Sequence, residues 1–202
     1  GNIDDRQINL AFNISERITE ILVEEGNTVK KGQLLGRLET VRIKNAIASA
    51  EAALEASAQN YERVKNGPRK EDIEIARANV AEAQASYENA EKDYLRQKSL
   101  AKSSAVSVQL AELAETKYLM TKAELNAAKK QLELLLAGSR VEDTAEAKAK
   151  VAQQKAELRI LEQQLADTQL FAPSDGIVRN RLLEPCEMTG PLLPVLTISL
   201  ID

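Results

Sequence analysis

Apolar and small residues recur every three or four positions through the middle of the chain, from about Thr40 to Thr168. Such spacing averages 3.5 residues and keeps one stripe on one side of a slightly underwound helix. That stripe can be buried only against another helix, so the pattern predicts a coiled coil. The stripe residues are Ile43, Ile47, Ala50, Leu54, Ser57, Tyr61 and Val64; Ile73, Ala76, Val80, Ala83, Tyr87, Ala90 and Tyr94; Ala111, Ala114, Tyr118, Thr121, Leu125, Ala128, Leu132 and Leu135; and Thr144, Ala147, Val151, Gln154, Leu158, Leu161 and Leu165.

A compact helical bundle is the alternative to an extended pair of arms. Helices in a compact bundle usually carry more than one apolar stripe, whereas these helices have one, which is rich in alanine. The remaining positions are mostly Glu, Lys, Gln and Arg, which form helices well and stay in water. The chain also has only two Phe and no Trp. We therefore expect a long antiparallel hairpin.

The repeat is interrupted at two related places, which begin at Gly67 and Gly138 and share the phrase Gly-x-Arg-x-Glu-Asp. A glycine suits the C-terminus of a helix, and Pro68 suits the first turn of a new one. Ser139 and Glu142 have the spacing of a capping box. Each arm is therefore expected to stop and restart once.

The repeat lapses a third time at 103–107, near its middle. If the chain reverses there, residues 40–102 form an outgoing arm and residues 107–167 a returning arm. The two glycine breaks then fall at nearly equal distances from the turn and lie side by side. With a rise of 1.5 Å per residue, each arm is about 90 Å long, which suits a spacer better than a substrate pocket.

Short alternating apolar runs with glycine turns flank this hairpin at residues 10–39 and 168–200, as in small antiparallel strands. The first begins with the alternation Leu10, Phe12 and Ile14. The second repeats the pattern of the first, with Leu182 corresponding to Val23. Because about thirty residues cannot bury a core alone, we predict one α+β fold in which the hairpin of residues 40–167 is inserted between two halves of a β-sandwich. Two unrelated β segments are the alternative.

The composition excludes several classes of function. A net charge of −4, with Lys and Arg spread along the helices, gives no nucleic-acid footprint. The chain has no His, and it has no phosphate-binding loop or nucleophile motif, so we expect no enzyme and no bound cofactor. The acidic pairs 71/72 and 142/143 suit the positive ends of helices, so we expect no metal site. An apolar run long enough to span a membrane is also missing.

Cys186 is the single cysteine, so it cannot form a disulfide within the chain. We expect its thiol to be buried and inert.

A family resemblance rests on the order of these parts. The phrase from Val23 to Gly32, the heptad hairpin, and Ala-Pro-x-x-Gly-x-Val from Ala172 to Val178 together resemble the lipoyl-plus-hairpin core of HlyD-like membrane fusion proteins. These are the periplasmic adaptors of tripartite efflux and type I secretion systems. The resemblance covers residues 10 to 200 and implies that the two β segments are halves of a lipoyl-like domain.

A narrower resemblance concerns the turn. Adaptors that dock onto TolC-type outer-membrane channels carry Arg, Leu and Ser at the hairpin tip with the spacing of Arg96, Leu100 and Ser107. The alternative is a solvated arginine, a core leucine and a helix N-cap. Arg96, Lys98 and Lys102 are basic, and no acidic residue lies between Asp93 and Glu112, so the tip is expected to be positively charged.

The resemblance also implies partners and a location. The partners are an inner-membrane transporter, a TolC-type channel, and further copies of the chain in a ring of six. The Gly-x-Arg-x-Glu-Asp phrase resembles that of adaptors that serve transporters of ABC type. The chain would lie in the periplasm, with a membrane anchor outside these residues. Two alternatives remain open. One is a structural coiled coil with β end-caps, and the other is a lipoyl or biotinyl carrier, for which Lys44 is the nearest lysine but is expected on a helix.

Overall fold

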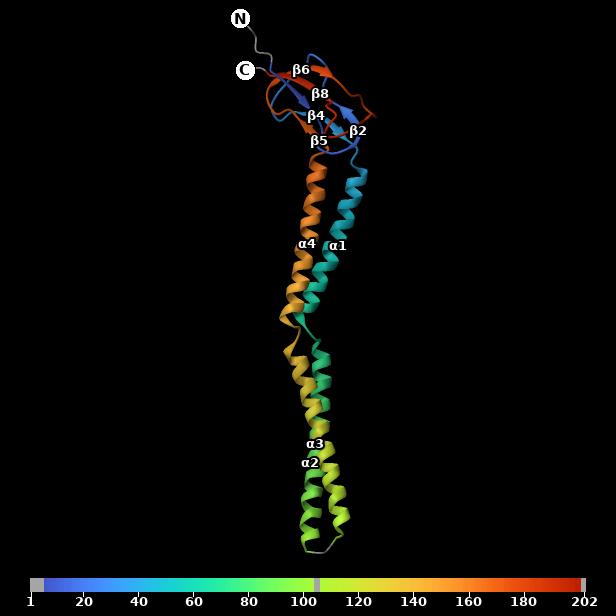
Figure 1. Cartoon of the computed structure of the whole chain (residues 1–202), viewed down its shortest axis with the longest axis vertical. Coiled ribbons are helices and arrows are strands. Elements are labelled where there is room, and N and C mark those ends of the chain that lie inside the picture. The colour runs from blue at the N-terminus through green and yellow to red at the C-terminus, as the bar shows by residue number, and fades with distance from the viewer. Residues whose placement is uncertain (1–5, 104–105, 201–202) are drawn as a thin grey trace. The chain divides into compact units, whose positions relative to one another are not determined.

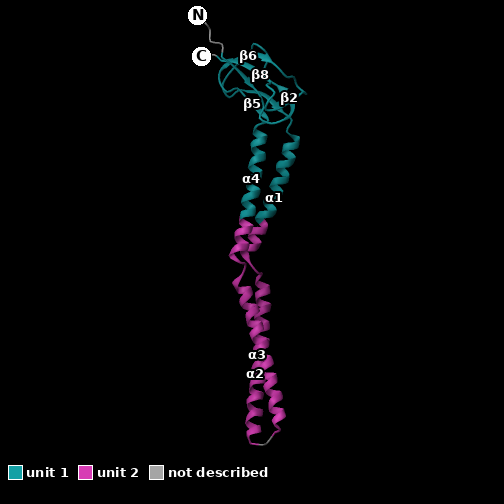
Figure 2. Cartoon of the chain, viewed as in Figure 1, with its two compact units in different colours: residues 1–58, 149–202 teal, residues 59–148 magenta. Residues whose placement is uncertain are grey.

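The computed structural model describes residues 6–103 and 106–200. It divides into two units, residues 1–58 with 149–202 and residues 59–148 (Figure 2). The chain order is four strands, four helices and four strands (Figure 1). The elements are β1 Gln7–Leu10, β2 Glu16–Ile21, β3 Thr28–Val29, β4 Leu34–Leu38, α1 Val41–Asn66, α2 Lys70–Lys102, α3 Val108–Ala137, α4 Val141–Ala166, β5 Gln169–Phe171, β6 Gly176–Arg181, β7 Met188–Thr189 and β8 Leu196–Leu200.

The eight strands form two antiparallel sheets, with the orders β1-β8-β6-β3 and β5-β4-β2-β7. Each sheet takes two strands from before the helices and two from after them. The two orders are related by exchanging each strand of the first half with its counterpart in the second: β1 with β5, β2 with β6, β3 with β7 and β4 with β8. The two halves are therefore intertwined, and the prediction of one sandwich with the hairpin inserted between its halves is confirmed.

Both halves contribute equally to the core between the sheets. Among the described residues, eight apolar ones are at most 1% exposed, four from each half: Phe12, Ile18, Val29, Leu35, Val178, Val195, Leu196 and Ile198. The burial of this apolar surface is the main driving force for closing the sandwich. Gly176 is required where β6 meets β8, because a Cβ there would lie 2.5 Å from Ile198 Cγ2 and 2.5 Å from the backbone oxygen of Ser199.

The repeat between the halves is shifted by one residue from the predicted correspondence. In the first half, the N–H of Asn27 donates to the oxygen of Glu24, and Gly26 has a φ of 86°. In the second half, the N–H of Glu187 donates to the oxygen of Glu184, and Cys186 has a φ of 74°. The turns superpose if Leu183, and not Leu182, corresponds to Val23.

The expectation of a buried Cys186 is wrong, because its thiol is exposed. The residue occupies the left-handed position of a surface turn, the place that Gly26 fills in the first half. A side chain at this position costs backbone strain, and it lies outside the core between the sheets.

The first strand also differs from the sequence pattern. The alternation Leu10, Phe12, Ile14 predicted a strand, but β1 occupies residues 7–10 and pairs with β8. Residues 11–15 are irregular, and Phe12 is nevertheless only 1% exposed. A residue in a loop can therefore imitate the alternation of a strand when it enters the core.

The four helices bury the predicted stripes. Every stripe residue is buried or half-buried, and the most deeply buried include Ala50, Ala76, Ala90, Leu125 and Ala147. In the second unit, α2 and α3 run antiparallel and pack along their length (Figure 1). The prediction of a helical hairpin is confirmed.

Both arms are interrupted where the repeat predicts. α1 ends at Asn66 and α3 at Ala137, and each is followed by a glycine with a φ of 69°. A Cβ placed on Gly67 would lie 3.7 Å from the Cα of Gly138, so the two breaks lie side by side as expected. Pro68, however, precedes the first turn of α2, which starts at Lys70.

The predicted capping box of Ser139 and Glu142 differs from what the structure shows. α4 starts at Val141, so Arg140 and not Ser139 directly precedes it. The hydroxyl of Ser139 donates instead across the break to the backbone oxygen of Val64, at 2.5 Å. That carbonyl lies in the last turn of α1, where carbonyls lack partners within the helix. Ser139 therefore links the two arms.

Candidate functional site

A serine hydrogen bond stabilises the helix end on each side of the hairpin turn. α2 ends at Lys102, and the hydroxyl of Ser103 donates to the oxygen of Leu100 at 2.9 Å. α3 begins at Val108, and the side chain of Ser107 accepts from the N–H of Leu110 at 3.3 Å. Ser107 is thus the N-cap of the returning helix. Of the predicted tip, residues 103–107, positions 104 and 105 lie outside the described residues.

Arg96 and Leu100 lie one helical turn apart near the end of α2. Arg96 pairs with Asp93 at 3.4 Å, and the two side chains are 65% and 50% exposed. A surface pair of this kind contributes little to stability, so the guanidinium remains available to another acceptor. Leu100 is 37% exposed. The structure therefore places both residues on the surface near the turn, and Ser107 on its other side.

Three tyrosines clamp α2 to α3 just behind the turn. The rings of Tyr94 and Tyr118 stack with centroids 5.2 Å apart, and Tyr87 packs against Tyr118 at 5.6 Å. The hydroxyl of Tyr94 donates to Glu115 at 3.3 Å and accepts from the Nζ of Lys98 at 2.8 Å. Tilted and offset aromatic pairs stabilise beyond their buried area, so this tyrosine clamp holds the arms in one register.

Hydrogen bonds in and beside the clamp raise the pKa values of Tyr87 and Lys98. The hydrogen bond that Tyr87 donates to the carboxylate of Glu91, at 2.7 Å, raises the pKa of Tyr87 above its ordinary value. The hydrogen bond to the hydroxyl of Tyr94 raises the pKa of Lys98. Both groups keep their protons at neutral pH, and Lys98 stays positively charged beside the turn.

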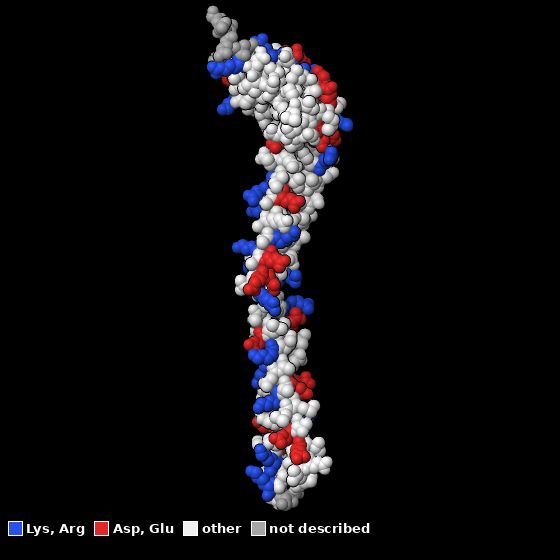
Figure 3. All heavy atoms as spheres, viewed as in Figure 1, with Lys and Arg blue, Asp and Glu red and all other residues white. Residues whose placement is uncertain are grey.

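Sequence analysis missed several exposed apolar residues beside the turn. Val108 is 68% exposed, Leu110 43%, Leu113 63% and Leu95 58%. At the tip, basic groups gather over α2, while the surface over α3 is mainly uncharged (Figure 3). The missed signal was apolar residues between stripe positions, where a solvated helix normally has polar ones. The tip therefore combines positive charge with an apolar surface.

The paired break is the second candidate feature of the hairpin. It borders a hollow of about 480 Å³ lined by Arg63, Val64, Gly67, Pro68, Gly138, Ser139 and Asp143. The predicted acidic pairs do lie in the first turns of α2 and α4. Asp72 also pairs with Arg69, at 3.3 Å between Oδ2 and Nε. The positive ends of α2 and α4 and the ion pair with Arg69 therefore explain why acidic residues lie here.

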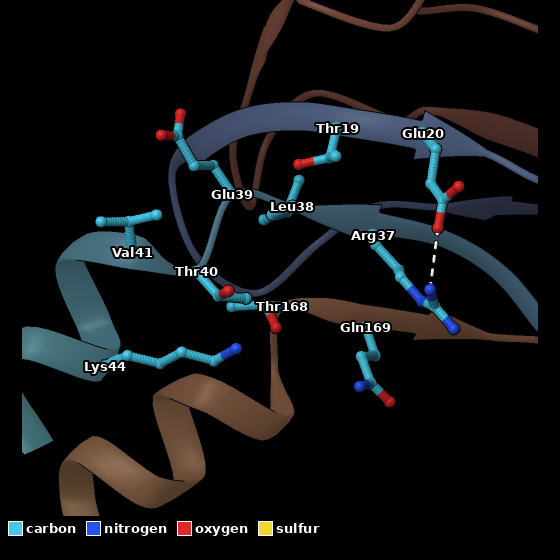
Figure 4. Close-up of a pocket in the computed structure, with 10 residues that line it drawn as sticks. All are labelled: Thr19, Glu20, Arg37, Leu38, Glu39, Thr40, Val41, Lys44, Thr168 and Gln169. Atoms are coloured by element: carbon cyan, nitrogen blue, oxygen red, sulfur yellow. Dashed lines mark hydrogen bonds and ion pairs between the residues drawn. The ribbon is translucent and has the colours of Figure 1, made fainter.

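A polar pocket of about 460 Å³ lies where α1 and α4 meet the sandwich (Figure 4). Arg37 and Glu20 form an ion pair of 2.9 Å at one side, and the side chain of Lys44 extends from α1 toward Thr168. The N–H of Leu38 donates to the oxygen of Thr168 at 2.9 Å and closes the sandwich there. Lys44 therefore lies on a helix, as expected, and a carrier lysine would need the tip of a β-turn.

The described residues hold no group of three or more His, Cys, Asp or Glu side chains placed to bind a metal ion. None of the helices, over their described residues, combines the length and the hydropathy that crossing a membrane requires.

Comparisons with known proteins find a family model for the hairpin and relatives of part of the chain. The family model of the YBHG alpha-helical hairpin domain matches residues 38–167. A UPF0194 membrane protein of Enterobacter sp. strain 638 is 38% identical over 80 residues, and UPF0194 membrane protein YbhG of Salmonella arizonae is also 38% identical over 80 residues. Each match covers 40% of this chain and 24% of the relative. The chain therefore spans about a quarter of the length of these relatives.

A solved structure extends the similarity to the whole fold. The periplasmic adaptor protein EmrA matches with a TM-score of 0.54 and 17% identity, over 96% of this chain and 72% of that chain. At this identity the match shows the fold alone. The sandwich and the inserted hairpin therefore occur together in a known adaptor.

Proposed function

Because the chain belongs to the YBHG alpha-helical hairpin family and is a membrane fusion protein, we propose that it acts as a periplasmic adaptor. In this role the hairpin tip docks onto a TolC-type outer-membrane channel, while other parts of the protein engage an inner-membrane transporter of ABC type. Copies of the chain assemble side by side in a ring, and a segment outside these residues attaches the protein to the inner membrane.

The tip is the observation that carries this proposal. Its surface combines the guanidinium of Arg96, the ammonium of Lys98 and the exposed side chains of Leu100, Val108 and Leu110. Arginine can make two parallel hydrogen bonds to a carboxylate, so a partner with acidic or carbonyl-rich loops fits this end. The apolar residues supply contact area, and the tyrosine clamp keeps the arms from separating when the tip binds.

The adaptor role requires no catalytic step from this chain. Its residues would hold two partners at a distance and in register, and energy would come from the transporter. Several exposed charges of the helices lie in i,i+3 ion pairs that need no further partner, such as Arg77 with Glu74 at 3.0 Å.

Export in cells tests the docking role. Arg96→Ala and Leu100→Asp should abolish export of the cognate substrate, because they remove the bidentate donor and the apolar contact. Arg77→Ala is the matched control, because Arg77 also lies on α2 in an exposed i,i+3 ion pair but far from the tip. It should leave export unchanged.

Circular dichroism and heat stability of the purified variants separate docking from folding. The tip variants should be as helical and as stable as the parent protein. Normal export by both tip variants would refute the proposal, and so would equal loss of export in Arg77→Ala.

A further inference from the structure

The tyrosine clamp concentrates the oxidisable rings of the protein at one place. The chain has four tyrosines and no Trp or His, and three of the four tyrosines lie in the clamp. The rings of Tyr94 and Tyr118 are nearly parallel, with an interplanar angle of 15° and centroids 5.2 Å apart. All three side chains are half-buried, so they keep their packing and still meet the solvent. A small oxidant in solution can therefore reach the stack.

Two of these phenols already have a base at hydrogen-bond distance. The hydroxyl of Tyr87 donates to Glu91 at 2.7 Å, and that of Tyr94 donates to Glu115 at 3.3 Å. A phenol that loses an electron becomes a strong acid, so a carboxylate placed to take the proton makes the oxidation easier. The clamp thus supplies the proton acceptors that tyrosine oxidation needs.

Lysine near the stack favours loss of the electron and the proton together. The ammonium of Lys98 lies 5.0 Å from the centre of the Tyr94 ring and donates to its hydroxyl at 2.8 Å. A positive charge at this place disfavours a positively charged ring. Transfer of the proton to Glu115 leaves a neutral phenoxyl radical, which this charge does not oppose.

The positions of the three rings determine which of them can couple within one chain. Tyr87 and Tyr94 lie on the same helix, seven residues and about 10 Å apart along its axis. Tyr118 on α3 packs against both. Coupling inside the clamp therefore involves Tyr118, and it joins α2 to α3. The shorter distance and the nearly parallel rings favour Tyr94 as the partner.

We propose that the clamp is an oxidative modification site, at which a one-electron oxidant couples Tyr94 to Tyr118 as dityrosine. Each ring gives one electron to the oxidant and its phenolic proton to a base. The two phenoxyl radicals then form one carbon–carbon bond between ring carbons next to the hydroxyl-bearing carbons. Each of these carbons loses its hydrogen as a proton, and each oxygen regains one, so that two electrons and two protons leave in all.

This bond would close residues 94–118, with the turn of the hairpin between them, into a covalent loop. The two arms could then no longer separate or slide behind the tip. A carbon–carbon bond is not reversed by thiols, so the change would be permanent. The site requires only the packing of α2 on α3 and does not depend on the adaptor role.

Oxidation of the full chain with a peroxidase and hydrogen peroxide tests the site. The peroxide takes up the two electrons and two protons and becomes two molecules of water. A Cys186→Ser background removes the exposed thiol, which would otherwise react with the oxidant. The monomer is isolated on a denaturing gel, so that links between copies do not contribute.

Tryptic peptides of that monomer locate the bond. Tyr94 lies in peptide 93–96 and Tyr118 in peptide 118–122. We expect these two peptides to appear as one linked species, lighter than their sum by two hydrogen atoms, with or without an added sulfoxide oxygen on Met120. Tyr87 lies in peptide 78–92, so a link to that residue is distinguishable.

Two phenylalanine variants provide the controls. Tyr118→Phe keeps a ring in the stack but has no phenol, so the monomer should lose both the linked peptides and the dityrosine fluorescence. Tyr61→Phe removes the tyrosine outside the clamp and should change neither. Circular dichroism before oxidation verifies that both variants fold as the parent protein does.

Three results would overturn the inference. They are dityrosine fluorescence in the Tyr118→Phe monomer at the level of the parent protein, absence of linked peptides from a parent protein that is fully helical, and a link of peptide 118–122 to peptide 78–92 only. Each can be obtained without any measurement of export, so the outcome is independent of the docking test.

Discussion

Replacing Tyr118 by leucine should loosen the hairpin directly behind its tip. Tyr118 lies between two other rings, with centroid distances of 5.2 Å to Tyr94 and 5.6 Å to Tyr87. Each aromatic pair contributes about 0.5–1.5 kcal/mol beyond its buried area. Losing both pairs should therefore lower the free energy of unfolding of the hairpin by about 1–3 kcal/mol, because leucine keeps an apolar side chain in the stripe but no ring.

Tyr61 on α1 provides a matched control. It also occupies a half-buried stripe position, and Lys65 lies over its ring at 5.8 Å, as Lys122 lies over Tyr118 at 5.8 Å. Within the described part of the chain, no second ring packs against it. Tyr61→Leu should therefore cost less than Tyr118→Leu.

Urea unfolding followed by circular dichroism at the helical minimum measures both variants. The difference between their free energies of unfolding should approach the stabilisation by the two ring pairs, about 1–3 kcal/mol. If Tyr118→Leu and Tyr61→Leu agree to within about 0.5 kcal/mol, the ring pairs contribute less than their usual range and the clamp does not hold the tip.

Two further predictions concern the break and the response to alkali. Gly138 has a φ of 69° and a ψ of −156°, a conformation that is costly for any residue with a side chain, so Gly138→Ala should destabilise the hairpin by about 1–3 kcal/mol in the same assay. Ala137→Gly, which leaves that conformation free, should cost under about 1 kcal/mol, and an equal loss in both variants would contradict the strain argument. The pKa of Tyr87 is raised in the folded state by its bond to Glu91, so its contribution to stability is complete below about pH 10 and is lost as the pH rises through the folded value. In Tyr87→Phe, the free energy of unfolding should therefore fall less steeply above about pH 10 than in the parent protein. An equally steep fall in the two proteins would refute this role of Tyr87.

The sequence pattern specifies burial better than it specifies contacts. Heptad spacing identified the stripe residues correctly, because a helix has few ways to bury a row of small residues. It did not identify the stack of Tyr87, Tyr94 and Tyr118, since periodicity gives positions within one helix and not the register between two. The signal would have been two tyrosines on one arm that lie on either side of the level of a single tyrosine on the other arm.

The errors have local causes. Ser139 was expected to cap its own helix, but its hydroxyl donates instead to the backbone oxygen of Val64 across the break. Cys186 was expected in the core by analogy with other free cysteines, but the turn needs a left-handed residue there. In both cases tertiary contacts or turn geometry outweighed a local preference that the sequence shows correctly.

The proposed function requires that the hairpin tip meets an outer-membrane channel. Site-specific photo-cross-linking in cells tests it most directly, with a photoreactive phenylalanine in place of Leu110 beside the turn and, as the control, in place of Ile160 on α4. Both side chains are exposed, at 43% and 60%. Docking through the tip predicts an adduct with a TolC-type channel protein from position 110 and none from position 160. An adduct with that channel from position 160 only, or adducts from position 110 with inner-membrane proteins only, would contradict it.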